Sequence, residues 1–259
     1  MSSKESSVGR LAAGRAGPSP VLLVSTLSIL SCIFAAALAG YILLAPHLAI
    51  GRNAVASATV LLLLIFTAVI LGLRHHAFPR FGHANTVTAV RAAFVSIIAA
   101  AVVFPGVQTG GEATPWVFFA LVLGALALDG VDGFVARHYE YQSDLGARFD
   151  MEIDALLILC LSASTFQQGK AGSWVLLIGL MRYGFVLAQY AAPRLKSPLP
   201  VSLRRKLVCV AQVAILCTIL LPCIGSAVST WLAGIALALL SYSFAIDCLH
   251  LVSEAEVSE

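Results

Sequence analysis

One polar stretch in an otherwise apolar chain decides the fold, and it begins with the run Asp129-Gly130-Val131-Asp132-Gly133-Phe134-Val135-Ala136-Arg137. After eight further residues it continues as Gly146-Ala147-Arg148-Phe149-Asp150-Met151-Glu152-Ile153-Asp154. If both segments are helical, Asp129 and Asp132 (i, i+3) share one face, and Asp150 and Asp154 (i, i+4) share another. The residues between the two pairs suit a chain reversal that lets these faces meet. The spacing therefore predicts four carboxylates in one site.

Four carboxylates at membrane depth repel one another and lose their hydration, so we expect divalent cations to neutralise them. Oxygen ligands of this kind select hard ions such as Mg²⁺, Mn²⁺ or Ca²⁺. Paired ions held by carboxylates serve in displacement reactions at phosphorus. The residues alone thus indicate a metal site that handles phosphate.

The composition indicates a polytopic membrane protein. Of the 259 residues, 59% are hydrophobic and only 11% are charged, whereas soluble domains carry about 25% charged residues. The net charge of +3 is too small to indicate a nucleic-acid partner. Apolar runs predict eight spanning helices, at about 20–45, 54–73, 87–105, 115–130, 149–166, 173–192, 207–223 and 228–250. The run at 115–130 is short, so we expect its helix to continue through Asp132 toward Arg137.

The basic residues predict the orientation. With the N-terminus inside, twelve of the sixteen Lys and Arg residues fall on that side and only Arg52 and Lys170 on the other, while Arg91 and Arg182 lie within spans. The positive-inside rule then places both termini and the aspartates in the cytoplasm. The six cysteines form no C-x-x-C pair and lie in apolar runs, so they are interpreted as small buried hydrophobes.

The aspartate stretch resembles the signature of the CDP-alcohol phosphotransferase family, D-x2-D-G-x2-A-R-x8-G-x3-D-x3-D. All eight fixed positions are filled, by Asp129, Asp132, Gly133, Ala136, Arg137, Gly146, Asp150 and Asp154. The resemblance implies an all-α membrane protein with a six-helix core at 84–251. Two additional transmembrane helices at 20–73 would precede that core. We expect a flexible cytoplasmic tail at 1–19, an interfacial segment at 74–86 and a second cytoplasmic tail at 252–259.

The same resemblance assigns roles to site residues. Two Mg²⁺ or Mn²⁺ ions would be held by Asp129, Asp132, Asp150 and Asp154, and Asp154 would also act as general base. The CDP donor would be bound by Asn85, Thr88, Gly133, Ala136, Arg137 and Gly146. Asn85, Thr88 and Arg91 match a weaker family pattern, N-x2-T-x2-R. Alternatives stay open for two of these residues. The position of Asn85 also suits a helix N-cap, and Arg91 is either a snorkelling side chain or a countercharge near the nucleotide or the carboxylates.

The acceptor side is less well specified. Arg182 lies within the sixth span, where a charge is costly and indicates function, and in this family an arginine there binds the acceptor phosphate. Arg205 and Lys206 join it as predicted acceptor-binding residues. The segment around them only partly resembles the family pattern G-K-x-K-T-x2-Q, since Arg205, Val208 and Cys209 replace the glycine, the second lysine and the threonine. Attraction of this basic segment to anionic lipid headgroups is the alternative.

These patterns predict an enzyme of phospholipid biosynthesis in a bacterial inner membrane. It would transfer a substituted phosphate, foremost phosphatidyl from CDP-diacylglycerol, to a polar alcohol and release CMP. The resemblance also favours a homodimer. The alternatives are an intramembrane Mg-dependent prenyltransferase, which would need aspartate motifs in both halves of the chain, and a cation transporter, which would leave the glycines and Arg137 without a role.

Overall fold

The computed structural model of the chain describes residues 19–75, 80–104, 110–139, 144–191 and 203–257, and within these ranges it contains helices and no strands. The eight α-helices are α2 (Pro20–Leu44), α3 (Arg52–Gly72), α4 (His83–Val103), α6 (Thr114–Tyr139), α7 (Asp144–Gln167), α8 (Leu176–Ala191), α9 (Leu203–Leu220) and α10 (Ser226–Val257). There are two short 3₁₀ turns: η1 (Leu73–His75) directly follows α3, and η2 (Ser173–Val175) directly precedes α8. The predicted tail at 252–259 is therefore helical as far as Val257, while residues 1–18 lie outside the described ranges.

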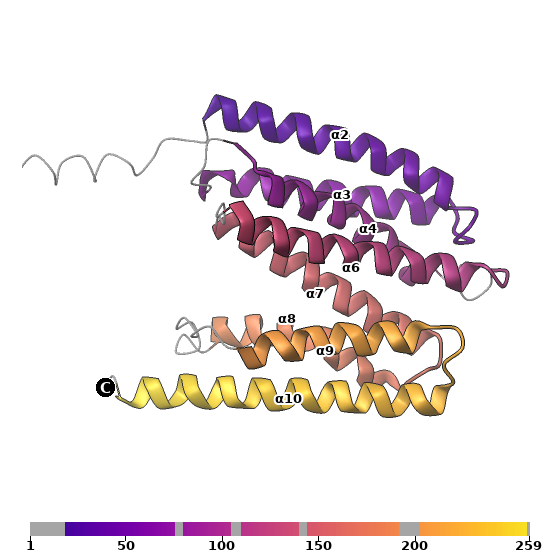
Figure 1. Cartoon of the computed structure of the whole chain (residues 1–259), viewed down its shortest axis with the longest axis vertical. Coiled ribbons are helices and arrows are strands. Elements are labelled where there is room, and N and C mark those ends of the chain that lie inside the picture. The colour runs from indigo at the N-terminus through magenta and orange to yellow at the C-terminus, as the bar shows by residue number, and fades with distance from the viewer. Residues whose placement is uncertain (1–18, 76–79, 105–109, 140–143, 192–202, 258–259) are drawn as a thin grey trace, which may run out of the picture.

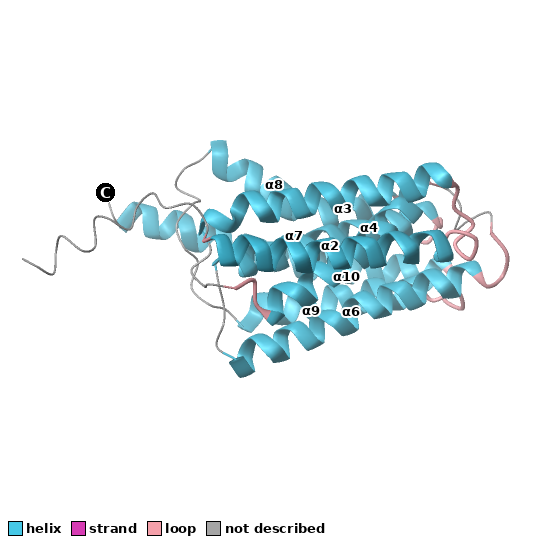
Figure 2. Cartoon of the chain, turned by 90° about the horizontal axis from the view of Figure 1, so that it is seen from above, coloured by secondary structure: helices cyan, strands magenta, loops and turns pink. Residues whose placement is uncertain are grey.

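The helices form an elongated bundle and run side by side in alternating directions (Figures 1 and 2). In Figure 1, α2, α3, α4 and α6 form one group and α8, α9 and α10 another, with α7 running diagonally between them. Accordingly, α7 contacts α4 on one side and α8 and α9 on the other. The second pair of aspartates thus lies on the helix that joins the two groups.

Four helices are long and apolar enough to cross a membrane: α2, α3, α4 and the Ser226–Leu249 part of α10. Shorter apolar helices lie at Thr114–Gly130, Ser173–Gln189 and Leu207–Leu220. α7 is in neither group, because its first half carries several acidic residues. Large apolar side chains such as Val24, Leu43 and Trp231 are exposed, as expected of lipid-facing surface. The chain is an integral membrane protein. That it has eight spans stays a prediction.

α4 is the central helix of the larger group. In its apolar window 67% of the residues are buried, against 22% for α2 and 28% for α3. Buried alanines, among them Ala89, Ala92 and Ala101, let α4 approach α6 and α7 closely. Gly82 (φ 84°) precedes the helix in a left-handed conformation that suits glycine and turns the chain into α4. This burial places the polar residues of α4 inside the bundle.

Candidate active site

Three polar residues of α4 lie at successive helical spacings and are all buried. Asn85, Thr88 and Arg91 are 7%, 2% and 0% exposed, and residues three apart on a helix share a face. The Asn85 side-chain amide donates to the carbonyl of Phe81 (2.5 Å), and the Thr88 hydroxyl donates to that of Ala84 (3.1 Å). The N-cap position is occupied by Gly82. The N-cap interpretation of Asn85 is therefore wrong, because α4 begins at His83, three residues earlier than that interpretation requires.

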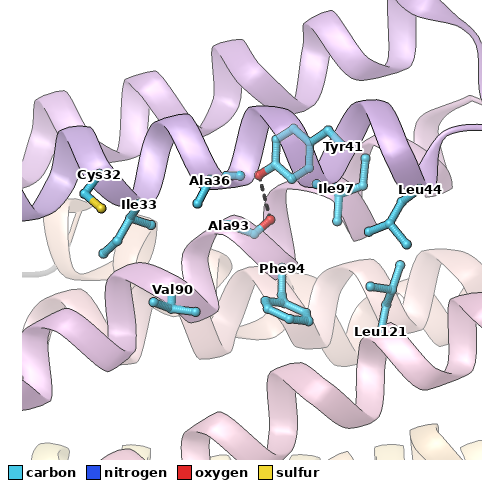
Figure 3. A pocket seen from close by; sticks show the side chains of 12 residues that line it. Cys32, Ile33, Ala36, Tyr41, Leu44, Val90, Ala93, Phe94, Ile97 and Leu121 are labelled. Carbon is cyan, nitrogen blue, oxygen red and sulfur yellow. Dashed lines mark hydrogen bonds between the residues drawn. The ribbon is translucent and has the colours of Figure 1, made fainter.

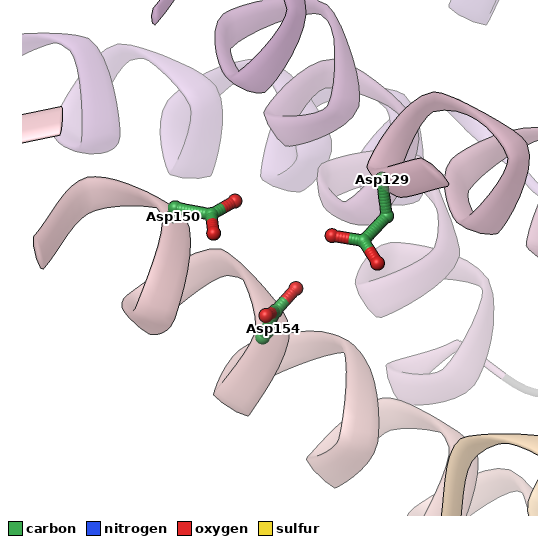
Figure 4. A group of neighbouring side chains, drawn as sticks. All are labelled: Asp129, Asp150 and Asp154. Atoms are coloured by element: carbon green, nitrogen blue, oxygen red, sulfur yellow. The ribbon is translucent and has the colours of Figure 1, made fainter. Parts of the chain in front are cut away.

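The carboxylates of Asp129 on α6 and of Asp150 and Asp154 on α7 point into a common space (Figure 4). Each offers a ligand atom, and these atoms all lie within 4.8 Å of one another. The side chains are half-buried, with exposed fractions of 36% to 47%. The aspartates of the two helices can face each other because both segments are helical and the connection between them is short: α6 extends to Tyr139 and α7 begins at Asp144. The prediction that the 115–130 helix continues past Asp132 is confirmed.

A fully buried guanidinium lies among these carboxylates. The two terminal nitrogens of Arg91 form ion pairs with Oδ1 of Asp129, with Oδ1 of Asp150 and, at 3.0 Å, with Oδ1 of Asp154. One of them also donates to the backbone carbonyl of Asp150 (3.3 Å). Arg91 is thus a countercharge to the carboxylates, and the snorkelling interpretation is wrong. α4, α6 and α7 meet at this one side chain.

The other residues predicted for the metals and the donor are placed only in part. Asp132, Gly133, Ala136 and Arg137 lie on the last turns of α6, but their side chains are outside the described part of the structure. Gly146 lies in the first turn of α7, four residues before Asp150 and hence on the same face. The fourth predicted metal ligand, Asp132, and the contacts of the donor residues therefore stay predictions.

The described residues fit a divalent cation. Arg91 contacts Oδ1 of each aspartate, and a carboxylate offers two oxygens. One guanidinium cannot balance three carboxylates, so the cluster keeps an excess of negative charge at a half-exposed position. Hard oxygen donors with this charge are the ligands that Mg²⁺ and Mn²⁺ prefer.

Comparison with known proteins supports the same conclusion. The model of the CDP-alcohol phosphatidyltransferase family matches residues 81–242, well over half of the chain. This chain belongs to that family. Its members transfer a phosphate-linked group from a CDP-alcohol to an acceptor and typically depend on divalent metal ions. No curated protein and no solved structure matches the chain. The match begins just before α4 and leaves α2 and α3 outside it.

Two of the predicted acceptor residues have acidic partners within the chain. Arg182 on α8 forms an ion pair with Glu152 on α7 (2.7 Å). Arg205 on α9 lies 3.4 Å from Asp247 on α10, which also pairs with Arg204 (2.5 Å). Asp247, which stands alone in the sequence, is therefore part of an ion-pair cluster. The side chain of Lys206 is outside the described residues. Arg182 thus already has an anionic partner, and its Nε has no hydrogen-bond partner among the described residues.

Two residues of α9 were not among the predicted site residues. Cys209 lies close enough to Asp129, Asp150, Asp154 and Arg182 for their charges to act on its thiol, which places it near both parts of the site. Gln212, one turn further, is buried and its side-chain nitrogen has no hydrogen-bond partner among the described residues. The only signal was the partial match of this segment to the family pattern, where Gln212 agrees and Cys209 departs. α9 thus brings one polar group, the Cys209 thiol, from the second helix group to the site.

Proposed function

We propose that the protein transfers the phosphatidyl group of CDP-diacylglycerol to a polar alcohol and releases CMP. The observation that carries this proposal is the cluster of Asp129, Asp150 and Asp154 around Arg91, in a chain of the CDP-alcohol phosphatidyltransferase family. Asp132 would complete the set of ligands for two Mg²⁺ or Mn²⁺ ions. When bound, such ions neutralise charge on a diphosphate and on the leaving nucleotide.

The chain's own residues would perform the remaining steps. Asp154 accepts the proton of the acceptor hydroxyl at a carboxylate oxygen, a transfer that is typically worth 10²–10⁴-fold in rate. The acceptor oxygen forms a bond to the β-phosphorus as the bond from that phosphorus to the CMP oxygen breaks. Gly133, Ala136 and Gly146 leave room for the cytidine and the diphosphate, Asn85 and Thr88 line the donor side, and Arg137 pairs with a phosphate.

The reaction would take place at the cytoplasmic face of a bacterial inner membrane, in a homodimer. The start of α4, the end of α6 and the start of α7 lie at one end of the bundle, together with the N-terminal end of α9 and its Arg204 and Arg205 (Figure 1). The positive-inside rule assigns this basic end to the cytoplasm. CDP-linked donors and Mg²⁺ are available on that side.

For the acceptor, we propose an alcohol that carries a phosphate, bound by Arg182, Arg205 and Lys206. The Nε of Arg182, which has no hydrogen-bond partner among the described residues, supports this assignment. An Arg182→Gln variant should raise the acceptor KM at least tenfold, because a hydrogen bond to a charged group is worth about 1.5–3 kcal/mol. The donor KM should stay within a few-fold. Glu152→Gln, which removes the internal partner of Arg182, should leave the acceptor KM unchanged or lower it.

The experiment that tests the proposed function is CMP release by the purified protein from CDP-diacylglycerol with Mn²⁺, screened against a panel of phosphorylated and unphosphorylated alcohols. We expect CMP release that needs both an alcohol and the metal. Asp150→Asn should abolish it and Glu152→Gln should not. Equal CMP release without any alcohol, or from a different CDP-linked donor only, would contradict the proposed reaction.

A further inference from the structure

An apolar cavity of about 310 Å³ lies between α2, α4 and α6 (Figure 3). Its walls include Ile33 and Tyr41 of α2, Val90 and Phe94 of α4, and Leu121 of α6. α2 lies outside the matched family region, 81–242, whereas α4 and α6 lie within it. The cavity is therefore built jointly by the added N-terminal part and the family core.

The chemistry of the walls excludes water as the occupant. Among the lining residues, the polar side-chain groups are the hydroxyl of Tyr41 and the thiol of Cys32. The Tyr41 hydroxyl donates to the carbonyl of Ala93 at 2.7 Å. A buried water needs about two to four polar partners, and apolar cavities without them stay dry. A hydrocarbon chain needs none, so the cavity suits an apolar occupant.

The cavity is continuous with the lipid-facing surface of α2. Only 22% of that span is buried, and Cys32 and Ala36, which line the cavity, are exposed. The medium around an exposed apolar span is the acyl region of the bilayer. A cavity of roughly 150 Å³ holds one benzene ring, so the present one has room for about a dozen carbon atoms. That accommodates the greater part of one phospholipid acyl chain and is too small for a whole phospholipid.

We propose that this cavity binds one acyl chain of a bilayer phospholipid that is not the substrate, and that the lipid joins α2 to the core. The carboxylate cluster lies on a different side of α4: Val90 and Phe94 line the cavity, whereas Arg91 contacts α6 and α7 at the aspartates. α4 and α6 pack against each other between the two places. The carboxylate cluster is thus separated from the cavity by packed helices, and the occupant is a second lipid.

Wild-type protein provides the first test. A phosphatidylcholine with a diazirine on one acyl chain is incorporated into vesicles with the full chain, activated by light, and the cross-linked peptides are identified. We expect cross-links concentrated on the cavity faces of α2 and α4, around Ile33, Tyr41 and Phe94, which persist when CDP-diacylglycerol is added in excess. Loss of these cross-links on addition of the donor would show that the cavity holds a substrate chain and would overturn the proposal. Cross-links spread evenly over the lipid-facing helices would also overturn it.

A matched pair of variants provides the second test. Ala36 and Ala35 are neighbouring exposed residues of α2, and only Ala36 lines the cavity. Ala36→Phe should fill the cavity, at least halve the phospholipid retained after detergent purification as measured by native mass spectrometry, and leave the donor KM unchanged. Ala35→Phe should retain the wild-type amount. Equal retention in both variants, or a raised donor KM in Ala36→Phe, would contradict a separate lipid site. If Ala36→Phe does not fold, the cross-linking experiment decides alone.

Discussion

Arg91 is the residue on which the site depends. Its guanidinium is fully buried, and its charge is balanced by three aspartates from two other helices. A buried cation without its partners is strongly destabilising, and so is a group of carboxylates without a cation. Arg91 therefore holds α4, α6 and α7 in the geometry that the carboxylates need, whether or not a metal ion is present.

Arg91→Gln should make the stability of the protein depend on metal ions. Without the guanidinium the aspartates repel one another, so we expect the Tm to fall in EDTA and to recover in part when Mn²⁺ neutralises them. The rise in Tm caused by Mn²⁺ should be larger than in the wild type, as measured by thermal unfolding in detergent. Arg91→Lys keeps the charge but loses the two-pronged contact, so its Mn²⁺-induced rise in Tm should lie between those of the wild type and Arg91→Gln. An equal loss of Tm with and without Mn²⁺ would mean that Arg91 acts by packing alone.

Asp154 should contribute more to turnover than to donor binding. It lies one helical turn beyond Asp150 on α7, and its assigned role is to accept a proton in the step that forms the new bond. Asp154→Asn should lower kcat by about 10²-fold or more, while binding of CDP weakens only in part. Single-turnover rates and equilibrium CDP binding separate these effects. A kcat near that of the wild type would exclude Asp154 as the base.

At the scale of elements, the contact between α7 and α8 positions Arg182 beside Glu152. Gly179 of α8 packs directly on the α7 backbone, since a Cβ at this position would lie 2.5 Å from the Cα of Leu159. For Gly184 on the same helix, no atom of the described residues lies within 4 Å of such a Cβ. The close approach of α8 to α7 thus requires a glycine at position 179 but not at position 184.

Gly179→Ala should force α8 away from α7 and destabilise the protein by about 1–3 kcal/mol, the usual cost of overpacking. Gly184→Ala is the control and should be neutral or slightly stabilising, because alanine is the better helix former. Chemical unfolding in mixed micelles measures both. Similar stabilities for the two variants would show that the contact at Leu159 relaxes without cost.

The sequence predicted those elements that depend on periodicity and spacing. The extension of α6 past Asp132 and the convergence of Asp129, Asp150 and Asp154 follow from helical spacing and a short connection. The pairings of Glu152 with Arg182 and of Asp247 with Arg204 do not, because they depend on which helices become neighbours. The N-cap interpretation of Asn85 failed for a simpler reason. The residues just before Asn85 suit the first turn of a helix equally well, and α4 begins at His83.

At the scale of the whole molecule, one basic residue on the side opposite to the predicted cytoplasmic face has a structural role. The ammonium group of Lys170 donates to the carbonyls of Ile219 and Leu221 at the end of α9, both at 2.7 Å. A cation at the C-terminal end of a helix satisfies carbonyls that lack helical partners. Its position on the side with few charges is therefore explained by helix capping.

The two groups of helices meet at α7, and the candidate site at this place lies within the family match. The signature aspartates and Arg91 fall within residues 81–242, and so do the residues of α8 and α9 that approach them. α2 and α3 add no residue to the described carboxylate cluster. Sequence alone could not predict the cavity they help to form, because it depends on how α2 packs against α4.

The central claim is that the aspartate cluster binds a divalent metal ion, and calorimetric titration of the purified protein with Mn²⁺ tests it most directly. Glu152→Gln is the matched control, since Glu152 lies on the same stretch of α7 between Asp150 and Asp154 but pairs with Arg182. We predict saturable Mn²⁺ binding in the wild type and in Glu152→Gln, and a loss of at least tenfold in affinity in Asp129→Asn and in Asp150→Asn. Unchanged binding in both aspartate variants, or an equal loss in Glu152→Gln, would contradict the claim.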